Sequence, residues 1–188
     1  MKLALLLSSI FLLFNGCLSF KEVDSQKNNL DVTNIKKLNG NYQIIQINND
    51  SIYKKQRVYS NLFQQLDRKL IKDTLHIDSL KTYSLKIDIL GEKKMKLLYL
   101  ENGTLFRERV IKTKLKKDGF LYLKNKNFQP LLIPYIAGAI DINKIRFGLD
   151  TNNNLILDVA NHTSGAILLI AFLDGRTNKY RLTYERID

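Results

Sequence analysis

The chain contains few residues that support covalent cross-links or metal chemistry. It has one cysteine, two histidines, two prolines and no tryptophan among its 188 residues. One cysteine excludes a disulfide within the chain, and a zinc site needs three or four ligands, which one cysteine and two distant histidines do not supply. We therefore predict that the apolar core alone holds the fold together, and we expect neither a metal nor a cofactor.

Negative charge is also scarce. Lysine and arginine number 30 against 18 acidic residues, which gives a formal net charge of +12. A basic protein can attract nucleic acid or anionic lipid, but no stretch interleaves aromatic residues with arginines as single-strand binders do, so we expect no nucleic-acid partner. An AT-rich genome over-supplies lysine, asparagine and isoleucine, which accounts for much of this charge, and attraction to an anionic membrane is the alternative. The basic cluster at Lys112, Lys114, Lys116 and Lys117 is interpreted as a solvated face, with a membrane-facing role as its alternative.

The one long apolar run of the sequence lies at its N-terminus. Residues 3–14 are apolar and uncharged and follow Lys2. They are too few to span a bilayer, which takes about 20 apolar residues in a helix. A positive start followed by a short apolar region is typical of a secretory signal peptide, so we expect the protein to be exported.

The residues that follow resemble the lipobox of bacterial lipoproteins, in which a small residue precedes a lipid-modified cysteine. Gly16 fits this pattern before Cys17, whereas Phe14 and Asn15 stand where leucine and a small residue are usual. The resemblance implies that residues 1–16 are a cleaved lipoprotein signal peptide and that acyl chains such as palmitate on Cys17 hold the protein to a membrane. An ordinary cleaved signal peptide and a retained anchor helix are the alternatives.

These features divide the chain into three segments. Residues 1–16 are the signal peptide, residues 17–35 are the lipidated cysteine with a polar, flexible tether, and residues 36–188 are a single domain of ordinary size. We expect the protein in the bacterial cell envelope, anchored by lipid to a bacterial membrane; we favour the outer membrane, with the inner membrane as the alternative. The sequence does not indicate whether the domain faces the periplasm or the outside.

From residue 38 onward the sequence favours β-strands. Residues 82–89 and 178–187 alternate between apolar and polar side chains, as half-buried strands do. Asn102-Gly103, Asp118-Gly119 and Asp174-Gly175 each separate two such runs and predict hairpin turns. The predicted strands are 40–47, 82–89, 94–100, 104–115, 120–123, 165–173 and 178–187. Strands at this spacing indicate an all-β barrel or sandwich.

Three segments depart from simple alternation. Apolar residues in 40–47 change parity along the strand, which predicts a β-bulge. Apolar residues in 58–70 recur at helical spacing, which predicts a short helix over an open end or one face of the sheet. Residues 165–173 are apolar at nearly every position, so we expect this strand to be covered on both faces.

The start of the domain carries a family resemblance. Residues 38–42 (LNGNY) resemble the first strand of small lipocalin-like proteins, where a glycine precedes an aromatic residue that plugs the barrel floor; Tyr42 stands where tryptophan is usual. Residues 180–187 fit a last barrel strand. With the lipobox, the chain resembles uncharacterised lipocalin-like lipoproteins of Bacteroidota-type bacteria. This implies a mainly β fold, an antiparallel up-and-down barrel or barrel-like sheet with one short helix.

For function, we expect a membrane-anchored envelope lipoprotein with a non-catalytic domain that binds a small apolar or amphipathic ligand. Five tyrosines are expected to face inward and contact it: Tyr42, Tyr83, Tyr99, Tyr180 and Tyr184. In the alternative interpretation these tyrosines fill the core, because small barrels are often packed solid. An alternative function is a structural or assembly factor that binds another envelope protein through residues 165–173.

A hydrolase is the least favoured function, and we predict that the protein is not an enzyme. His162, Ser164 and Asp158 are the residue types of a catalytic triad, but no glycine-flanked nucleophile elbow surrounds any serine. His162 is predicted in a turn, and His76 on the outward face of a strand.

Two segments predict loops or edges. Pro130 and Pro134 cannot donate hydrogen bonds to a ladder, so the residues between and just after them are expected at a sheet edge or in a loop. Residues 150–154 (DTNNN) imitate the start of a calcium loop, but Leu155 and Asn161 stand where the loop needs glycine and glutamate. We therefore predict an Asn-rich turn there.

Overall fold

The computed structural model describes residues 20, 27–47, 61–67, 77–124, 128–133, 137–167 and 171–188, and of these only the backbone at 128–133, 137–141, 164–167 and 171–174. The predictions for residues 1–16, Cys17 and His76 lie outside this part of the chain.

The described residues form mostly β-strands. In chain order the elements are β1 (Lys27–Asn28), η1 (Ile35–Leu38), β2 (Gly40–Gln46), α2 (Leu62–Leu66), β3 (Tyr83–Ile89), β4 (Lys94–Glu101), β5 (Thr104–Leu115), β6 (Leu121–Leu123), β7 (Phe128–Ile133), β8 (Ala137–Asp150), β9 (Leu155–Ile167) and β10 (Ala171–Arg186). Here η1 is a 3-10 helix. Lys27 and Asn28 pair with Asp150 and Leu149 of β8, so ordered structure is present inside the segment predicted as a tether.

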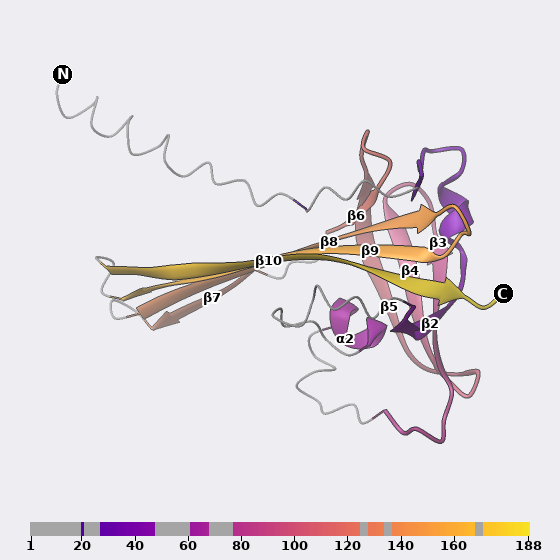
Figure 1. The fold of residues 1–188 in the computed structure, drawn as a ribbon, viewed down its shortest axis with the longest axis horizontal. Helices are drawn as coiled ribbons and strands as arrows, with labels where there is room; N and C mark the ends of the chain where they lie inside the picture. The colour runs from indigo at the N-terminus through magenta and orange to yellow at the C-terminus, as the bar shows by residue number, and fades with distance from the viewer. Residues whose placement is uncertain are drawn as a thin grey trace.

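Eight strands close an antiparallel barrel (Figure 1). Strands β2 to β6 pair in sequence order, β6 pairs with β8, and β8, β9 and β10 lead back to β2. Each strand of the barrel therefore pairs with the barrel strand that follows it in the chain, and the last strand, β10, pairs with the first, β2. Strands β1 and β7 pair with β8 outside the barrel. The predicted lipocalin-like, up-and-down barrel with one short helix is confirmed.

Alternating side chains fill the barrel. In β3 and β4 the inward positions include Leu85, Ile87, Leu97 and Tyr99, all 0% exposed. The apolar face removed from water drives the sheet to close on itself, because each buried side chain of this size contributes about 1.5–3 kcal/mol.

Helical elements cover the two ends of the barrel. At the end where β2 begins, Ile35 and Leu38 of η1 are buried, and the Tyr42 hydroxyl donates to the Leu38 carbonyl oxygen at 3.0 Å. At the other end Phe63 of α2 is 0% exposed, and its ring centroid lies 5.0 Å from that of Tyr99. The helix predicted within 58–70 is therefore confirmed as a shorter element that covers one barrel end.

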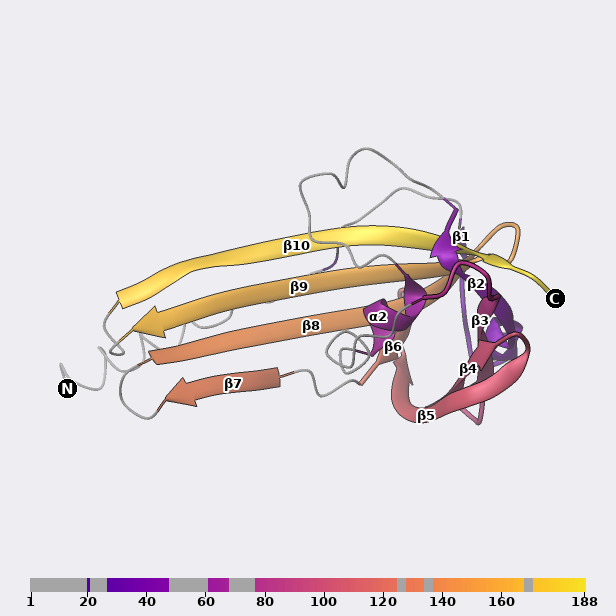
Figure 2. The ribbon, with the colours of Figure 1, turned by 90° about the horizontal axis from the view of Figure 1, so that it is seen from below.

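Four strands continue beyond the barrel (Figure 2). We call this the sheet extension: residues 128–133 of β7, 137–142 of β8, 162–167 of β9 and 171–176 of β10. Strand β6 pairs with β8 only at Ile145–Phe147, and β2 pairs with β10 only near Tyr184 and Arg186. The extension therefore projects from the barrel end that α2 covers. Among the described residues its strand β7, which contains Pro130, pairs with β8 alone, so the predicted edge position is confirmed for residues 131–133, whereas Pro134 lies outside the described residues.

The hairpin turn predicted at Asp174-Gly175 is wrong. Strand β10 passes through this dipeptide, and its register against β9 shifts between Leu173 and Arg176. The predicted strand 165–173 is divided between β9 and β10, whose Ile167 and Ala171 pair. An Asp-Gly dipeptide can form a bulge within a long strand as well as a hairpin turn, because glycine tolerates backbone angles that other residues avoid.

Of two further local predictions, one is wrong and one is confirmed. His162 lies within β9 rather than in a turn, because its backbone pairs with Ile142 on one side and Thr177 on the other. In β2 the predicted bulge is present as a register shift against β10 between Tyr184 and Arg186. Ile45 and Ile47 are nevertheless 54% and 48% exposed, so the bulge does not bring their side chains into the core.

Candidate functional site

The tyrosines predicted to contact a ligand line the barrel interior. Tyr42, Tyr99, Tyr180 and Tyr184 are 0–3% exposed, and Tyr83 is partly buried against the same core. A side chain with no exposed area has no water-sized space against it, so these rings pack as core residues do. Burial raises the pKa of both the Tyr42 and Tyr99 hydroxyls to about 12. The arrangement matches the interpretation in which the tyrosines fill the core.

The α2 end of the barrel is closed by polar contacts as well as apolar ones. The Tyr180 hydroxyl donates to Oε1 of Gln65 at 2.8 Å. Asp67, whose side chain is 4% exposed, forms ion pairs through Oδ2, which lies 2.7 Å from Nη2 of Arg107 and 3.2 Å from Nη1 of Arg109. These contacts connect the helix to β5 and β10 and hold it over the opening.

The residues of the suggested triad do not come together. Nδ1 of His162 lies 2.8 Å from the Thr177 hydroxyl, which is its cross-strand neighbour. Asp158 is four positions earlier on the same strand, about 13 Å away at the usual rise per residue, and both of its carboxylate oxygens contact arginines. Its position therefore does not allow it to orient His162. Ser164 is described only by its backbone, within β9.

A buried row of charges crosses three strands on the outer face of the barrel. Arg146, Asp158 and Arg181 are directly paired in register on β8, β9 and β10. Nε of Arg146 donates to Oδ2 of Asp158 at 2.8 Å, and Nε of Arg181 donates to Oδ1 at 2.6 Å. The Arg146 guanidinium also lies 4.0 Å from the centroid of the Phe120 ring. Because every member has a partner, this row is a structural element rather than an open binding site.

The Asn-rich turn is also satisfied internally. The Asp150 carboxylate accepts from the backbone N–H groups of Asn152 and Asn154 and from the Asn154 side chain at 2.8–3.0 Å. The predicted turn between β8 and β9 is thus confirmed. Within the described ranges no group of three or more His, Cys, Asp or Glu side chains is placed to hold a metal ion, and no described helix is long and apolar enough to cross a membrane.

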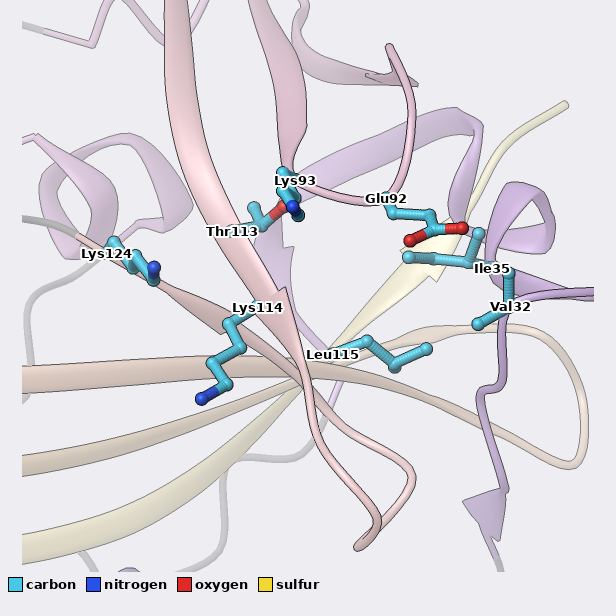
Figure 3. A pocket seen from close by; sticks show the side chains of 8 residues that line it. All are labelled: Val32, Ile35, Glu92, Lys93, Thr113, Lys114, Leu115 and Lys124. Carbon is cyan, nitrogen blue, oxygen red and sulfur yellow. The ribbon is translucent and has the colours of Figure 1, made fainter.

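A cleft lies beside η1, where β5 extends past the start of β4 (Figure 3). Its volume is about 350 Å³, near the lower end of the 300–1,000 Å³ typical of small-molecule sites. Eight residues line it: Val32, Ile35, Glu92, Lys93, Thr113, Lys114, Leu115 and Lys124.

The cleft combines apolar and cationic side chains. In Figure 3, Val32, Ile35 and Leu115 gather on one side with Glu92, whereas Lys114 and Lys124 lie on the other side of β5. Thr113 is 2% exposed, and its hydroxyl oxygen is buried without a hydrogen-bond partner among the described residues. A buried hydroxyl with no partner costs about 1–3 kcal/mol, so a ligand that supplied a partner would recover this free energy.

Most of the cleft could not be found from the sequence. Only Lys114 belongs to the predicted basic cluster, whose four lysines are all exposed as expected for a solvated face. The other residues come from η1, the β3–β4 turn and the ends of β5 and β6, which are far apart in the chain. One signal was visible: Thr113 interrupts the apolar set at an inward position of a strand.

Comparison with known proteins adds no identity. The chain matches no protein-family model, and it is similar neither to a curated protein nor to a solved structure. The function must therefore be argued from the chain itself.

Proposed function

We propose that this chain is a non-catalytic, lipid-anchored protein of the bacterial cell envelope that binds a small amphipathic anion in the cleft beside η1. The observation that carries the proposal is the lining of this cleft, which combines apolar side chains, three lysines and Thr113, whose buried hydroxyl has no partner among the described residues. An apolar tail would cover Val32, Ile35 and Leu115, and an anionic head would accept hydrogen bonds from the polar side.

The charges of the cleft support an anion over a neutral ligand. Lys93, Lys114 and Lys124 outnumber the single carboxylate, Glu92. None of the three ammonium groups forms an ion pair within the described part of the chain. Hydrogen bonds to a charged group contribute about 1.5–3 kcal/mol, more than bonds between neutral groups.

The filled barrel supports a ligand site outside the barrel axis. The four most buried tyrosines leave no water-sized space beside them, whereas the cleft is open to solvent at Val32, which is 59% exposed. A ligand can therefore enter the cleft without unpacking the core.

Calorimetric titration with decanoate tests the ligand. We expect the wild-type domain to bind, decanol to bind more weakly, and Lys93→Met and Thr113→Val each to weaken decanoate binding about tenfold, the equivalent of 1.4 kcal/mol. Lys86→Met, which removes an exposed lysine from β3 away from the cleft, is the matched control. Thr113→Val should leave the free protein at least as stable, which separates lost binding from unfolding. Equal affinity of all variants would refute the site.

The lipid anchor is tested separately. The N-terminal peptide of protein purified from its host should begin at Cys17 and carry the mass of acyl chains. A Cys17→Ser variant should leave the detergent phase in a two-phase partition. If that variant partitions as the parent does, or if the leader remains uncut, the anchor is refuted whatever the cleft binds.

A further inference from the structure

The sheet extension has a polar boundary that runs level across its four strands. The register pairs Gln129 with Asp141, Asp141 with Thr163, and Thr163 with Arg176. These four residues therefore form one row from β7 to β10. The row separates the barrel side of the extension from its distal part.

The distal part contains one charged residue, Asp174, which lies in the register shift directly beyond the boundary row. Residues 130–140 and 164–173 include no Asp, Glu, Lys or Arg. The register arranges their strand positions in four rows beyond the boundary. From the boundary outward the rows are Pro130, Ile140 and Ser164, with Asp174 and Gly175 in the register shift of β10; Leu131, Ala139, Gly165 and Leu173; Leu132, Gly138, Ala166 and Phe172; Ile133, Ala137, Ile167 and Ala171.

The strand positions place mostly apolar residues on both faces of this distal sheet. Successive residues of a strand belong to opposite faces, and the rows that contain Leu131 and Leu132 are adjacent and equally apolar. An antiparallel sheet with one face in water would alternate between apolar and polar positions. A protein partner docked on one face would leave the other face in water, whereas lipid surrounds both.

We propose that the sheet extension inserts into one leaflet of an anionic bilayer, as far as the row of Gln129, Asp141, Thr163 and Arg176. At about 3.4 Å per residue in an antiparallel strand, four rows extend about 14 Å. The hydrocarbon core of a bilayer is about 30 Å thick, so the distal part matches the depth of a single leaflet and is too short to cross both.

The charges at the boundary fit anionic headgroups. Arg176 lies in the polar row, and Lys144 and Lys179 follow on its barrel side. These three cations outnumber the two carboxylates, Asp141 in the row and Asp174 directly beyond it. Basic residues at this depth are attracted to the negative surface of a membrane, and this attraction falls off within a Debye length. Anionic lipid should therefore deepen insertion.

The outer edges of β7 and β10 are unpaired in the described extension. Backbone groups without partners are costly in hydrocarbon. Pro130 removes one donor from the β7 edge, and the other edge groups should pair with those of a neighbouring copy in the bilayer. Lipid therefore surrounds the two faces of the extension, and pairing between the edges of neighbouring copies is a consequence of insertion.

A fluorescent probe at a new cysteine tests this in the full chain. Phe172→Cys on β10 and Leu132→Cys on β7 lie in the same row, and either one keeps the test available if the other fails to fold. Asn178→Cys, an uncharged position on the barrel side of the boundary, is the matched control. Each is labelled with a nitrobenzoxadiazole group and reconstituted in vesicles of phosphatidylcholine with phosphatidylglycerol, and wild-type protein labelled in parallel gives the contribution of Cys17.

We expect probes at positions 132 and 172 to resist aqueous iodide and to be quenched by lipids spin-labelled on their acyl chains. The probe at position 178 should be quenched by iodide. In vesicles of phosphatidylcholine alone, acyl-chain quenching should fall several-fold. Iodide access at positions 132 and 172 would overturn the proposal. Protection from iodide without acyl-chain quenching would also overturn it and would show that a protein partner or a second copy covers the faces of the sheet in place of lipid. Neither outcome depends on the cleft or on its ligand.

Discussion

The Tyr180 hydroxyl donates a hydrogen bond to Oε1 of Gln65 at 2.8 Å and so joins the last barrel strand to helix α2. Both residues are buried, at 3% and 2% exposed. The helix has only five described residues, far fewer than an isolated helix needs to be stable in water. Its position over the barrel end therefore depends on tertiary contacts of this kind.

Replacing Tyr180 with phenylalanine should destabilise the fold by about 1–2 kcal/mol. The ring remains in place, but the buried Gln65 carbonyl loses a donor. Urea unfolding followed by circular dichroism measures the change. Tyr83→Phe is the control, because the Tyr83 hydroxyl accepts only a long 3.4 Å contact from the exposed Asp78 N–H. Equal effects of the two substitutions would contradict the role of this hydrogen bond.

Replacing Asp158 with asparagine should be more damaging, at about 3–5 kcal/mol. The change removes the charge that separates Arg146 and Arg181, whose side chains are 10% and 9% exposed, so that two buried cations face each other and Arg146 retains Asp118, at 3.1 Å, as its carboxylate partner. The free energy of unfolding from urea titration reports the loss. Asp188→Asn, at an exposed ion pair with Arg186, should change stability by less than about 1 kcal/mol. Similar losses of stability in both variants would contradict the conclusion that Arg146, Asp158 and Arg181 form a buried row of charges.

Stability should fall as pH rises from 10 to 12. Burial raises the pKa of Tyr42 and Tyr99 to about 12, from 10.0. The unfolded chain therefore releases these protons first, and above pH 10 the folded state binds more protons. The contribution is fully present below pH 10 and is lost through the folded pKa, at about 1.4 kcal/mol per pH unit for each tyrosine. Urea midpoints across this range measure the slope, and Tyr42→Phe should reduce it. An unchanged slope in that variant would contradict the assignment.

The barrel itself could be predicted because its strands are half buried. Residues 82–89 and 94–100 alternate in the sequence, and β3 and β4 place those apolar sets in the core. The helix within 58–70 was found in the same way, from the spacing of side chains that α2 buries. In each case one strand or helix contains the whole signal.

The extension and the cleft could not be predicted because no single segment encodes them. Strand β8 was missed, since its polar and glycine positions become a strand only through pairing with β6, β7 and β9. The row of Arg146, Asp158 and Arg181 depends on the register of three strands. The cleft joins η1 to β5 across about 80 positions of the chain. Sequence patterns describe what one strand buries, whereas register and closure decide what its neighbours are.

The close approach of Gly148 to Phe120 gives a final prediction, that Gly148→Ala destabilises the fold by about 1–3 kcal/mol through overpacking. A Cβ atom on Gly148 would lie 2.7 Å from Cε1 of Phe120. The ring is 3% exposed and is held between the Lys27 ammonium and the Arg146 guanidinium, at 4.1 and 4.0 Å from its centroid, so it cannot move away freely. Urea unfolding of Gly148→Ala alone and combined with Phe120→Leu measures the coupling. The loss should shrink in the leucine background, because the smaller side chain leaves room for the methyl group. Equal losses in both backgrounds would show that the strain lies elsewhere in β8.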